Sequence, residues 1–304
     1  MVHPVSGNRA SGGSDDEAFS LTVPPDLPIP VLVAVPHAGR AYPAEVLAAM
    51  RHPALVPARL EDRYADRLGA DIAAATGASL LIAHAPRALL DLNRAPDDID
   101  WSMISGSGRR APPHSAANRR ARSGLGLVPR RLPGTGEIWR HRLTAEEVER
   151  RIETIHRPYH RALASTLDAI RDRWGAALLI DLHSMPPLGR GSSAAEFVVG
   201  DRFGASCTAR LASLSLEQLA EAGRRVAHNR PYSGGFALDH HAAPRRGVHA
   251  IQIEVCRATY LDSALDAPGP RFAAVARVLA TLVRRLGREV AGMGDPAALR
   301  QAAE

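Results

Sequence analysis

Short apolar runs alternate along the chain with segments in which apolar residues recur every three or four positions. Apolar runs bounded by turn residues are typical of buried strands, and the longer period is typical of amphipathic helices. Strands are predicted at 30–35, 78–83, 88–92, 176–182, 196–200 and 249–255, and helices at 61–75, 144–174, 216–228 and 271–290. This order predicts a mixed α/β sheet that is covered by helices on both faces.

Several helix ends carry recognisable signals. Thr144 and Ser215 are each followed three positions later by a Glu or Gln, so both are predicted as N-caps. Gly77 is placed to end the helix at 61–75. Pro158 lies inside the long helical pattern and predicts either a kink or a split into two helices.

The chain of 304 residues is predicted to form one α/β domain over residues 29–292. Residues 1–28 are rich in Ser, Gly, Asp and Pro and are expected to be a loose N-terminal arm. Residues 293–304 are expected to be a C-terminal tail. Residues 101–140 have no clear period and many Gly, Pro and Arg, which predicts a long loop or a lid insertion.

The chain is basic, with a formal charge of +6, and all 38 of its Lys and Arg residues are Arg. A basic chain can bind nucleic acid, but that reading requires a basic patch with a recognisable reader motif. The sequence contains no such motif. We therefore expect no nucleic-acid partner and attribute the charge to compositional bias.

Cysteine use and hydropathy point to a cytoplasmic protein. Cys207 and Cys256 do not make a disulfide framework, and two cysteines suit a reducing compartment. Residues 1–19 contain no apolar segment of the signal-peptide kind. No stretch approaches the roughly 20 apolar residues of a membrane span, so no membrane partner is expected.

Polar clusters follow three predicted strands, at 36–39, 91–94 and 181–184. In open α/β sheets, ligands bind outside the carboxyl ends of the strands. His37 and His183 would therefore project into a shared cleft. A single histidine at such a place is more often structural, but two of them with acids nearby favour a metal. A catalytic zinc ion usually has three protein ligands and one open position.

The third ligand should be a carboxylate. Asp62 and Asp66 open the predicted helix at 61–75, one turn apart on one face. Either acid could instead serve only to complement the helix dipole. Asp181 points to the same side of its strand as His183, and we expect it to orient that histidine rather than to bind the metal.

Glu254 lies inside an apolar strand, where a carboxylate needs a partner or a task. Burial would raise its pKa, as suits a general base, and the alternative is an ion pair with Arg257 or another arginine. Arg87, Asn93 and Arg94 form a polar group suited to holding a substrate carboxylate. The alternative for these three is a solvated loop.

Nine segments resemble the N-formylglutamate amidohydrolase family. They are PHAGRAYP at 36–43, EDRYADRL at 61–68, PRALLDLNR at 86–94, GEIWRHRLTAEEVERRI at 136–152, HRPYHRAL at 156–163, DLHSMPP at 181–187, VGDRFGASC at 199–207, NRPYSGGF at 229–236 and AIQIEV at 250–255. Each motif alone is weak, but the series follows the family's order from about residue 30 to 265. The resemblance is therefore specific.

The family is similar to the zinc carboxypeptidases and the aspartoacylases. The resemblance implies a three-layer α/β/α mixed sheet of the phosphorylase/hydrolase-like type, with one zinc ion per chain. It implies His37 and His183 as zinc ligands. In the carboxypeptidase relatives a Glu follows the first His by three residues, but Arg40 occupies that position here. An acid of the next helix must replace it, and Asp62 is preferred over Asp66.

The resemblance also assigns roles around the metal. It implies Glu254 as the general base, Arg87 as the group that polarises the scissile carbonyl, and Asn93 with Arg94 as the substrate-carboxylate site. Family motifs add three pocket residues, Arg202, Asn229 and Tyr232.

The implied reaction is hydrolysis of a small-molecule N-acyl acidic amino acid, with N-formyl-L-glutamate giving formate and L-glutamate as in histidine degradation. The Arg- and Pro-rich stretch at 105–133 departs from the family, so another acyl group is an alternative. A second alternative is a non-catalytic binding protein on the same scaffold.

Overall fold

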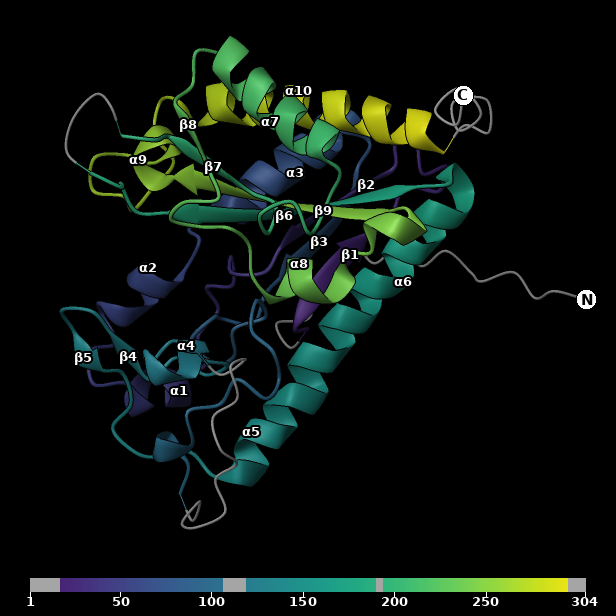
Figure 1. Cartoon of the computed structure of the whole chain (residues 1–304). Helices are drawn as coiled ribbons and strands as arrows, with labels where there is room; N and C mark the ends of the chain where they lie inside the picture. The colour runs from purple at the N-terminus through teal and green to yellow at the C-terminus, as the bar shows by residue number, and fades with distance from the viewer. Residues whose placement is uncertain (1–16, 106–118, 190–193, 295–304) are drawn as a thin grey trace, which may run out of the picture.

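The computed structural model describes residues 17–105, 119–189 and 194–294. Its centre is a seven-stranded sheet in the order β1-β3-β2-β6-β9-β7-β8 (Figure 1). The strands are β1 (Phe19–Thr22), β2 (Val31–Val35), β3 (Ser79–Ala83), β6 (Ala177–Met185), β7 (Phe197–Gly200), β8 (Val226–His228) and β9 (Val248–Cys256). β3, β2, β6 and β9 run parallel, whereas β1 and β7 pair antiparallel with β3 and β9. The expected mixed sheet is confirmed.

Helices cover both faces of this sheet (Figure 1). One face carries α3 (Ala65–Thr76), α7 (Ala209–Glu221), α9 (Arg257–Tyr260) and α10 (Phe272–Met293), and the other carries α6 (Arg157–Trp174) and α8 (Phe236–His241). Side chains alternate accordingly in β2, where Val33 packs with the first group and Leu32 with the second. The three-layer α/β/α architecture is therefore confirmed.

A region of short elements lies below the α6 face (Figure 1). It contains α1 (Ala44–Ala49), α2 (Val56–Leu60), η1 (Trp101–Met103), α4 (Arg119–Arg122), β4 (Arg131–Leu132), β5 (Gly136–Glu137) and α5 (Ala145–Arg151). Leu127, Ile138 and Trp139 of this region are buried in the same core as α6. The described part of the expected loop or lid at 101–140 is thus packed, and residues 106–118 lie outside the described residues.

The strand predicted at 88–92 is wrong. Ala88, Leu90 and Leu92 are buried, but the backbone turns instead of pairing with the sheet. Its Asp91 N–H donates to Leu127 O at 2.7 Å. The apolar run thus correctly predicts that this segment is buried, but the segment is a turn packed under the sheet and not a strand.

The helix predicted at 216–228 is also wrong in its bounds. α7 begins earlier, and Ser215 lies inside it and donates to Leu211 O at 2.8 Å instead of capping it. Gly223 adopts a left-handed φ of 70° just after the helix and turns the chain. Residues 226–228 then form β8, because they add a parallel strand beside β7.

Both chain ends differ in part from expectation. Phe19–Thr22 of the expected arm forms the edge strand β1, and residues 1–16 lie outside the described residues. The last helix runs to Met293, so only the final part of the expected tail, residues 295–304, lies beyond the described chain. None of the described helices is long and apolar enough to cross a membrane.

The long helical pattern at 144–174 forms one continuous rod. Thr144 caps it, since its side chain accepts the Glu147 N–H at 3.1 Å. Instead of the kink or split expected at Pro158, a π-helical segment, η4 (Ile152–His156), joins α5 to α6. The proline is the second residue of α6 and directly follows the π-helical segment.

Candidate active site

A block of four buried polar residues lies on β6 and β9. Asp181 is the register neighbour of Gln252, and His183 is the register neighbour of Glu254. The residues between them belong to the core on the α3 and α10 side. Because side chains alternate along a strand, all four polar groups face the α6 side near the carboxyl ends of the strands.

His37 and Asp62 reach this block from two turns. His37 follows β2, and Asp62 precedes α3, which begins at Ala65 and not at residue 61 as predicted. The Asp62 N–H donates to His37 O at 2.8 Å and joins the two turns. Asp62 Oδ2 lies 3.5 Å from His37 Nδ1 and 3.1 Å from His183 Nδ1.

These three residues, His37, Asp62 and His183, form a group that could hold a metal ion. Their ligand atoms lie within 4.8 Å of one another, and all three residues are buried. His37 Nδ1 is buried without a hydrogen-bond partner among the described residues. A buried nitrogen of this kind needs a partner, and a metal ion would supply one.

A carboxylate fixes the other ring nitrogen of each histidine. His37 Nε2 lies 2.7 Å from Asp91 Oδ1, and His183 Nε2 lies 2.9 Å from Asp181 Oδ2. Ionised carboxylates only accept hydrogen bonds, so each Nε2 carries a proton, and in the neutral ring Nδ1 is the atom that can bind a metal. Metal-binding histidines in proteins are oriented in the same way.

The second oxygen of Asp62 is also held. Ser184 Oγ donates to Asp62 Oδ1 at 3.0 Å, and Arg257 Nε donates to Ser184 Oγ at 3.0 Å. Arg257 Nη2 lies 3.5 Å from the same carboxylate. Arg257 thus serves Asp62, and its alternative pairing with Glu254 is not among the ion pairs of the described residues.

The pKa values of Asp62 and His183 in this group are strongly shifted. Burial alone would raise the pKa of Asp62, but hydrogen bonds and charges from His183 and His37 hold that pKa well below its ordinary value. Burial likewise opposes protonation of His183, but Asp181, Asp62 and Glu254 hold its pKa well above the ordinary range. The carboxylates therefore create a place that favours positive charge.

Asp66, the alternative acid, lies elsewhere. Its two carboxylate oxygens accept from the Arg40 guanidinium at 2.9 and 2.8 Å. The structure therefore brings Asp62, and not Asp66, to the histidines. Arg40, which replaces the glutamate of the carboxypeptidase relatives, is itself occupied by this ion pair.

Glu254 is buried beside the group. Its Oε1 accepts from Gln252 Nε2 at 2.9 Å. Burial raises its pKa to about 7, and the negative charges of Asp62 and Asp181 act in the same direction. A carboxyl group with this pKa can take up and release a proton near neutral pH.

Arg87 and Arg94 flank the turn that contains Asp91. Arg87 Nε donates to Asp91 Oδ2 at 2.9 Å. Arg94 Nη1 donates to Asn93 O at 2.7 Å, and its Nε donates to Leu125 O at 2.9 Å. Both guanidiniums are therefore fixed by the protein at the edge of the site.

Asn93 is enclosed by protein groups. Its Nδ2 lies 3.3 Å from both Asp181 Oδ2 and Gln252 Oε1, and 3.2 Å from His183 Nε2, which already donates to Asp181. Its Oδ1 accepts the Ala237 N–H at 2.9 Å. These interactions tie two strands, a turn and α8 together.

The three other expected pocket residues do not all lie at the site. Tyr232 lies near the centre, since burial and then the charge of Glu254 raise its pKa. Asn229 Nδ2 donates to Asp201 Oδ1 at 2.7 Å, and Arg202 pairs with Asp239 at 2.5 Å. Among the described residues, neither Asn229 nor Arg202 contacts the metal-binding group, and each instead braces a neighbouring turn.

Sequence reasoning did not single out Asp91, Ser184 or Gln252 as site residues. Two of them carried a usable signal, because Asp91 lies in a strand-end cluster and Gln252 alternates with Glu254 on β9. Ser184 also lies in a strand-end cluster, but its hydrogen bond to Asp62 Oδ1 joins residues far apart in the sequence and could not be predicted from it.

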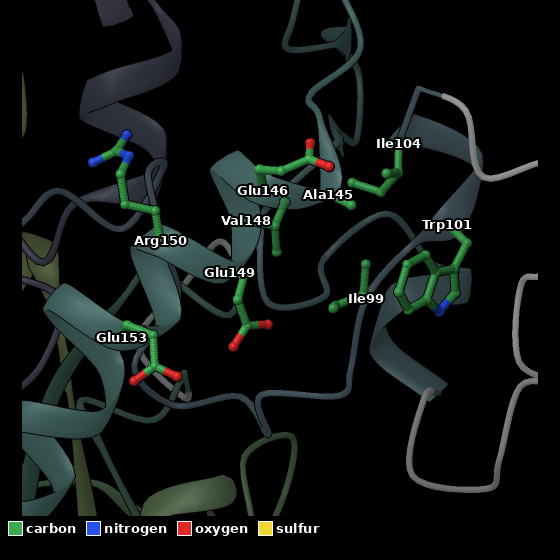
Figure 2. A pocket seen from close by; sticks show the side chains of 9 residues that line it. All are labelled: Ile99, Trp101, Ile104, Ala145, Glu146, Val148, Glu149, Arg150 and Glu153. Carbon is green, nitrogen blue, oxygen red and sulfur yellow. The ribbon is translucent and has the colours of Figure 1, made fainter.

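A pocket of about 510 Å³ lies apart from this centre, between η1 and α5. Figure 2 shows Trp101, Ile99 and Ile104 across from the α5 residues, with the carboxylates of Glu149 and Glu153 on the helix side. None of the metal-group residues lines it. This pocket is thus separate from the titratable cluster.

Comparison with known proteins agrees with this arrangement. The sequence pattern of the N-formylglutamate amidohydrolase family matches residues 29–261. The N-formylglutamate deformylase of Pseudomonas aeruginosa is 32% identical over 266 residues, covering 85% of this chain and 91% of that protein. The Pseudomonas putida protein of the same name is 32% identical over 242 residues, covering 77% of this chain and 82% of that protein.

A solved structure agrees as well. The N-formylglutamate amidohydrolase of Ralstonia eutropha JMP134 superposes with a TM-score of 0.79 at 32% identity, covering 90% of this chain and 98% of that chain. The match of fold, motif order and length shows that this chain belongs to the N-formylglutamate amidohydrolase family, whose members are hydrolases that act on an amide.

Proposed function

We propose that this chain is a zinc-dependent amidohydrolase that converts N-formyl-L-glutamate to formate and L-glutamate. The observation that carries the proposal is the convergence of His37, Asp62 and His183 beside the buried carboxyl group of Glu254. The names of both curated relatives support the substrate. Cys207 and Cys256 are buried and unpaired, which supports a cytoplasmic setting.

Three atoms would hold the zinc ion, namely Nδ1 of His37, Nδ1 of His183 and one carboxylate oxygen of Asp62. Two histidines and one carboxylate are a usual set for catalytic zinc, which leaves a position open. When bound, zinc supplies Lewis acidity toward the attacking water and the amide carbonyl. The residues fit this metal because His37, Asp62 and His183 are buried and their ligand atoms lie within 4.8 Å of one another.

Glu254 would move the proton. Gln252 holds its Oε1, which leaves Oε2 to accept a proton from the water that attacks the formyl carbon. The same carboxyl group would then deliver the proton to the departing amine nitrogen, giving formate and a free α-amino group. A pKa of about 7 suits both halves of this cycle.

The substrate would be held by positive charge and hydroxyl groups. Arg87 is fixed by Asp91 at the edge of the site and would polarise the scissile carbonyl. Tyr232 lies near Glu254 and would contact the reacting amide. Arg94 would bind a substrate carboxylate, and the contacts expected from Asn93, Arg202 and Asn229 stay predictions.

The test is amine release from N-formyl-L-glutamate by the zinc-loaded protein, before and after chelation. N-acetyl- and N-succinyl-L-glutamate and N-formyl-L-aspartate are assayed beside it. Chelator-sensitive turnover of N-formyl-L-glutamate is expected. Preference for another member of the panel would keep the chemistry and change the substrate. Zinc binding without turnover of any of them would favour a binding protein.

A further inference from the structure

One turn, residues Asp91 to Arg94, contacts both histidines of the metal-binding group. Asp91 Oδ1 lies 2.7 Å from His37 Nε2, and Asn93 Nδ2 lies against the His183 ring. The turn is closed from within, since Asp91 Oδ1 also accepts the Asn93 N–H at 2.8 Å. The position of this turn therefore sets the orientation of both rings.

Two buried imidazoles on the long helix hold this turn by its carbonyl groups. His160 Nε2 lies 2.9 Å from Leu92 O, and His156 Nε2 lies 2.9 Å from Arg94 O. A carbonyl oxygen only accepts hydrogen bonds, so both Nε2 atoms carry a proton. The two carbonyls flank Asn93 in the sequence, and the two histidines thus pin the backbone on both sides of it.

The helix has an unusual local geometry at this point. His156 is the last residue of the π-helical segment η4, and His160 follows one turn later in α6. A π-helical segment adds a residue to the helical path, which rotates the following residues by about 100° around the axis. Here that rotation presents both imidazoles to the turn, and their ring centroids lie 4.3 Å apart.

The imidazoles are neutral donors. Burial lowers the pKa of His160 to about 2 and also lowers the pKa of His156. A neutral His160 that donates from Nε2 must accept at Nδ1, where His241 Nε2 of α8 lies 2.9 Å away. α8 also donates the Ala237 N–H to Asn93 Oδ1. The long helix and α8 therefore both hold the same turn by hydrogen bonds.

We infer that His156 and His160 are positioning residues of the zinc site, and this inference rests on the proposed function. Neither residue touches the metal-binding atoms. They act through the carbonyls of Leu92 and Arg94, which hold Asp91 and Asn93 against the two ring systems.

Two variants of one residue separate this role from general packing. The Nε2 of glutamine lies about as far from the backbone as the Nε2 of histidine, so His160→Gln keeps a donor for Leu92 O. Asparagine places its amide near the Nδ1 position, so His160→Asn loses that donor. We expect His160→Asn to weaken zinc binding at least about 10-fold in chelator competition, within the range typical of supporting contacts.

The same variant should lower kcat together with the zinc affinity, and KM should also rise to the extent that the turn displaces Arg94, the proposed substrate-carboxylate ligand. His160→Gln should recover most of the zinc affinity and of kcat. Thr166→Val is the matched control, since it removes a buried hydrogen bond of the same helix, Oγ1 to Ala162 O, without touching the turn. It should lower Tm and leave the zinc Kd unchanged.

The inference is overturned if His160→Asn shows a wild-type zinc Kd and kcat together with a Tm loss like that of Thr166→Val. Should His160→Asn fail to fold, His156→Asn, which removes the hydrogen bond to Arg94 O, decides by the same measurements.

Failure of the proposed function gives a different pattern, in which the wild-type protein itself binds no zinc or turns over no substrate. In that case the Nε2–H proton resonances of metal-free His37 and His183 test the positioning role. They should shift in His160→Asn and not in His160→Gln, and unchanged resonances in both would overturn the inference.

Discussion

Asp62 has two oxygens with separate tasks. Oδ2 faces the Nδ1 atoms of His37 and His183, and Oδ1 is held by Ser184, which is held in turn by Arg257. A carboxylate fixed at one oxygen presents the other in a single orientation. Such preorganisation is what a three-ligand zinc site requires.

Ser184→Ala tests that arrangement. The change removes the hydrogen bond to Asp62 Oδ1, so we expect zinc affinity to fall about 10-fold. Chelator competition measures it. Ser206→Ala is the control, because Ser206 is also buried and donates to a backbone oxygen, Ala250 O at 2.8 Å. Equal zinc affinities for both variants would contradict the role of Ser184.

Asp62→Asn and Asp66→Asn test the choice of acidic ligand. The amide of Asp62→Asn lacks the negative charge that zinc prefers, so bound zinc should be lost on dialysis. Asp66→Asn should keep stoichiometric zinc, because Asp66 pairs with Arg40 and not with the two histidines in the described part of the chain. Metal analysis after dialysis distinguishes them. Retained zinc in Asp62→Asn would remove Asp62 from the site.

At the scale of elements, the long helix packs below the sheet and also supports the site. Its α5, η4 and α6 parts run continuously below the sheet, and α8 lies beside α6 (Figure 1). His160 of α6 and His241 of α8 are joined side chain to side chain. This contact buries titratable groups between two helices, which makes their packing sensitive to acid.

That sensitivity has a definite sign. Burial lowers the pKa of His160 to about 2 and of His241 to about 3, whereas an unfolded histidine titrates near 6.5. Between these values the unfolded chain binds more protons, so the free energy of unfolding falls as pH drops below about 6.5. Each group contributes at most about 1.4 kcal/mol per pH unit.

Urea unfolding of the wild type and of His160→Gln between pH 7 and pH 5 measures this effect. Glutamine does not titrate, so the variant should lose less stability over that range than the wild type. Parallel pH profiles for the two proteins would show that His160 does not stay neutral in the folded state.

The sequence predicts the strands that form the centre of the sheet well. β2, β6 and β9 are buried along their whole length, and β2 and the first half of β6 read as continuous apolar runs, which have few alternatives. The segment at 88–92 has the same composition, but a turn buries it without strand pairing. The strand β8 was missed because its three residues follow the arginines at 224 and 225 and carry no apolar run.

Some residues of the site could likewise be predicted from the sequence, and others could not. His37, His183 and Glu254 were predicted because they stand at the ends of apolar strands, where polar residues are conspicuous. Contacts to backbone oxygens, such as His160 with Leu92 O, leave no mark in the sequence. They depend on how the helix lies against the turn, which only the folded chain determines.

At the scale of the whole molecule, the site lies where the carboxyl ends of the parallel strands meet the region of short elements below the sheet (Figure 1). The sheet supplies His183 and Glu254, and the turns between elements supply His37 and Asp62. The rigid strands thus fix His183 and Glu254. The arginines at 87 and 94 flank a turn beside the site, and under the proposed function they would select an anionic substrate.

The central claim is that a zinc site and Glu254 together hydrolyse N-formyl-L-glutamate. The most direct measurement is zinc content and kcat, taken on the same preparations of the wild type and of Glu254→Gln. We expect one zinc ion per chain in both, and a kcat in the variant lower by about 10²- to 10⁴-fold, the usual contribution of a general base. A variant with bound zinc and near-normal kcat, or a zinc-loaded wild type without turnover, would contradict the account.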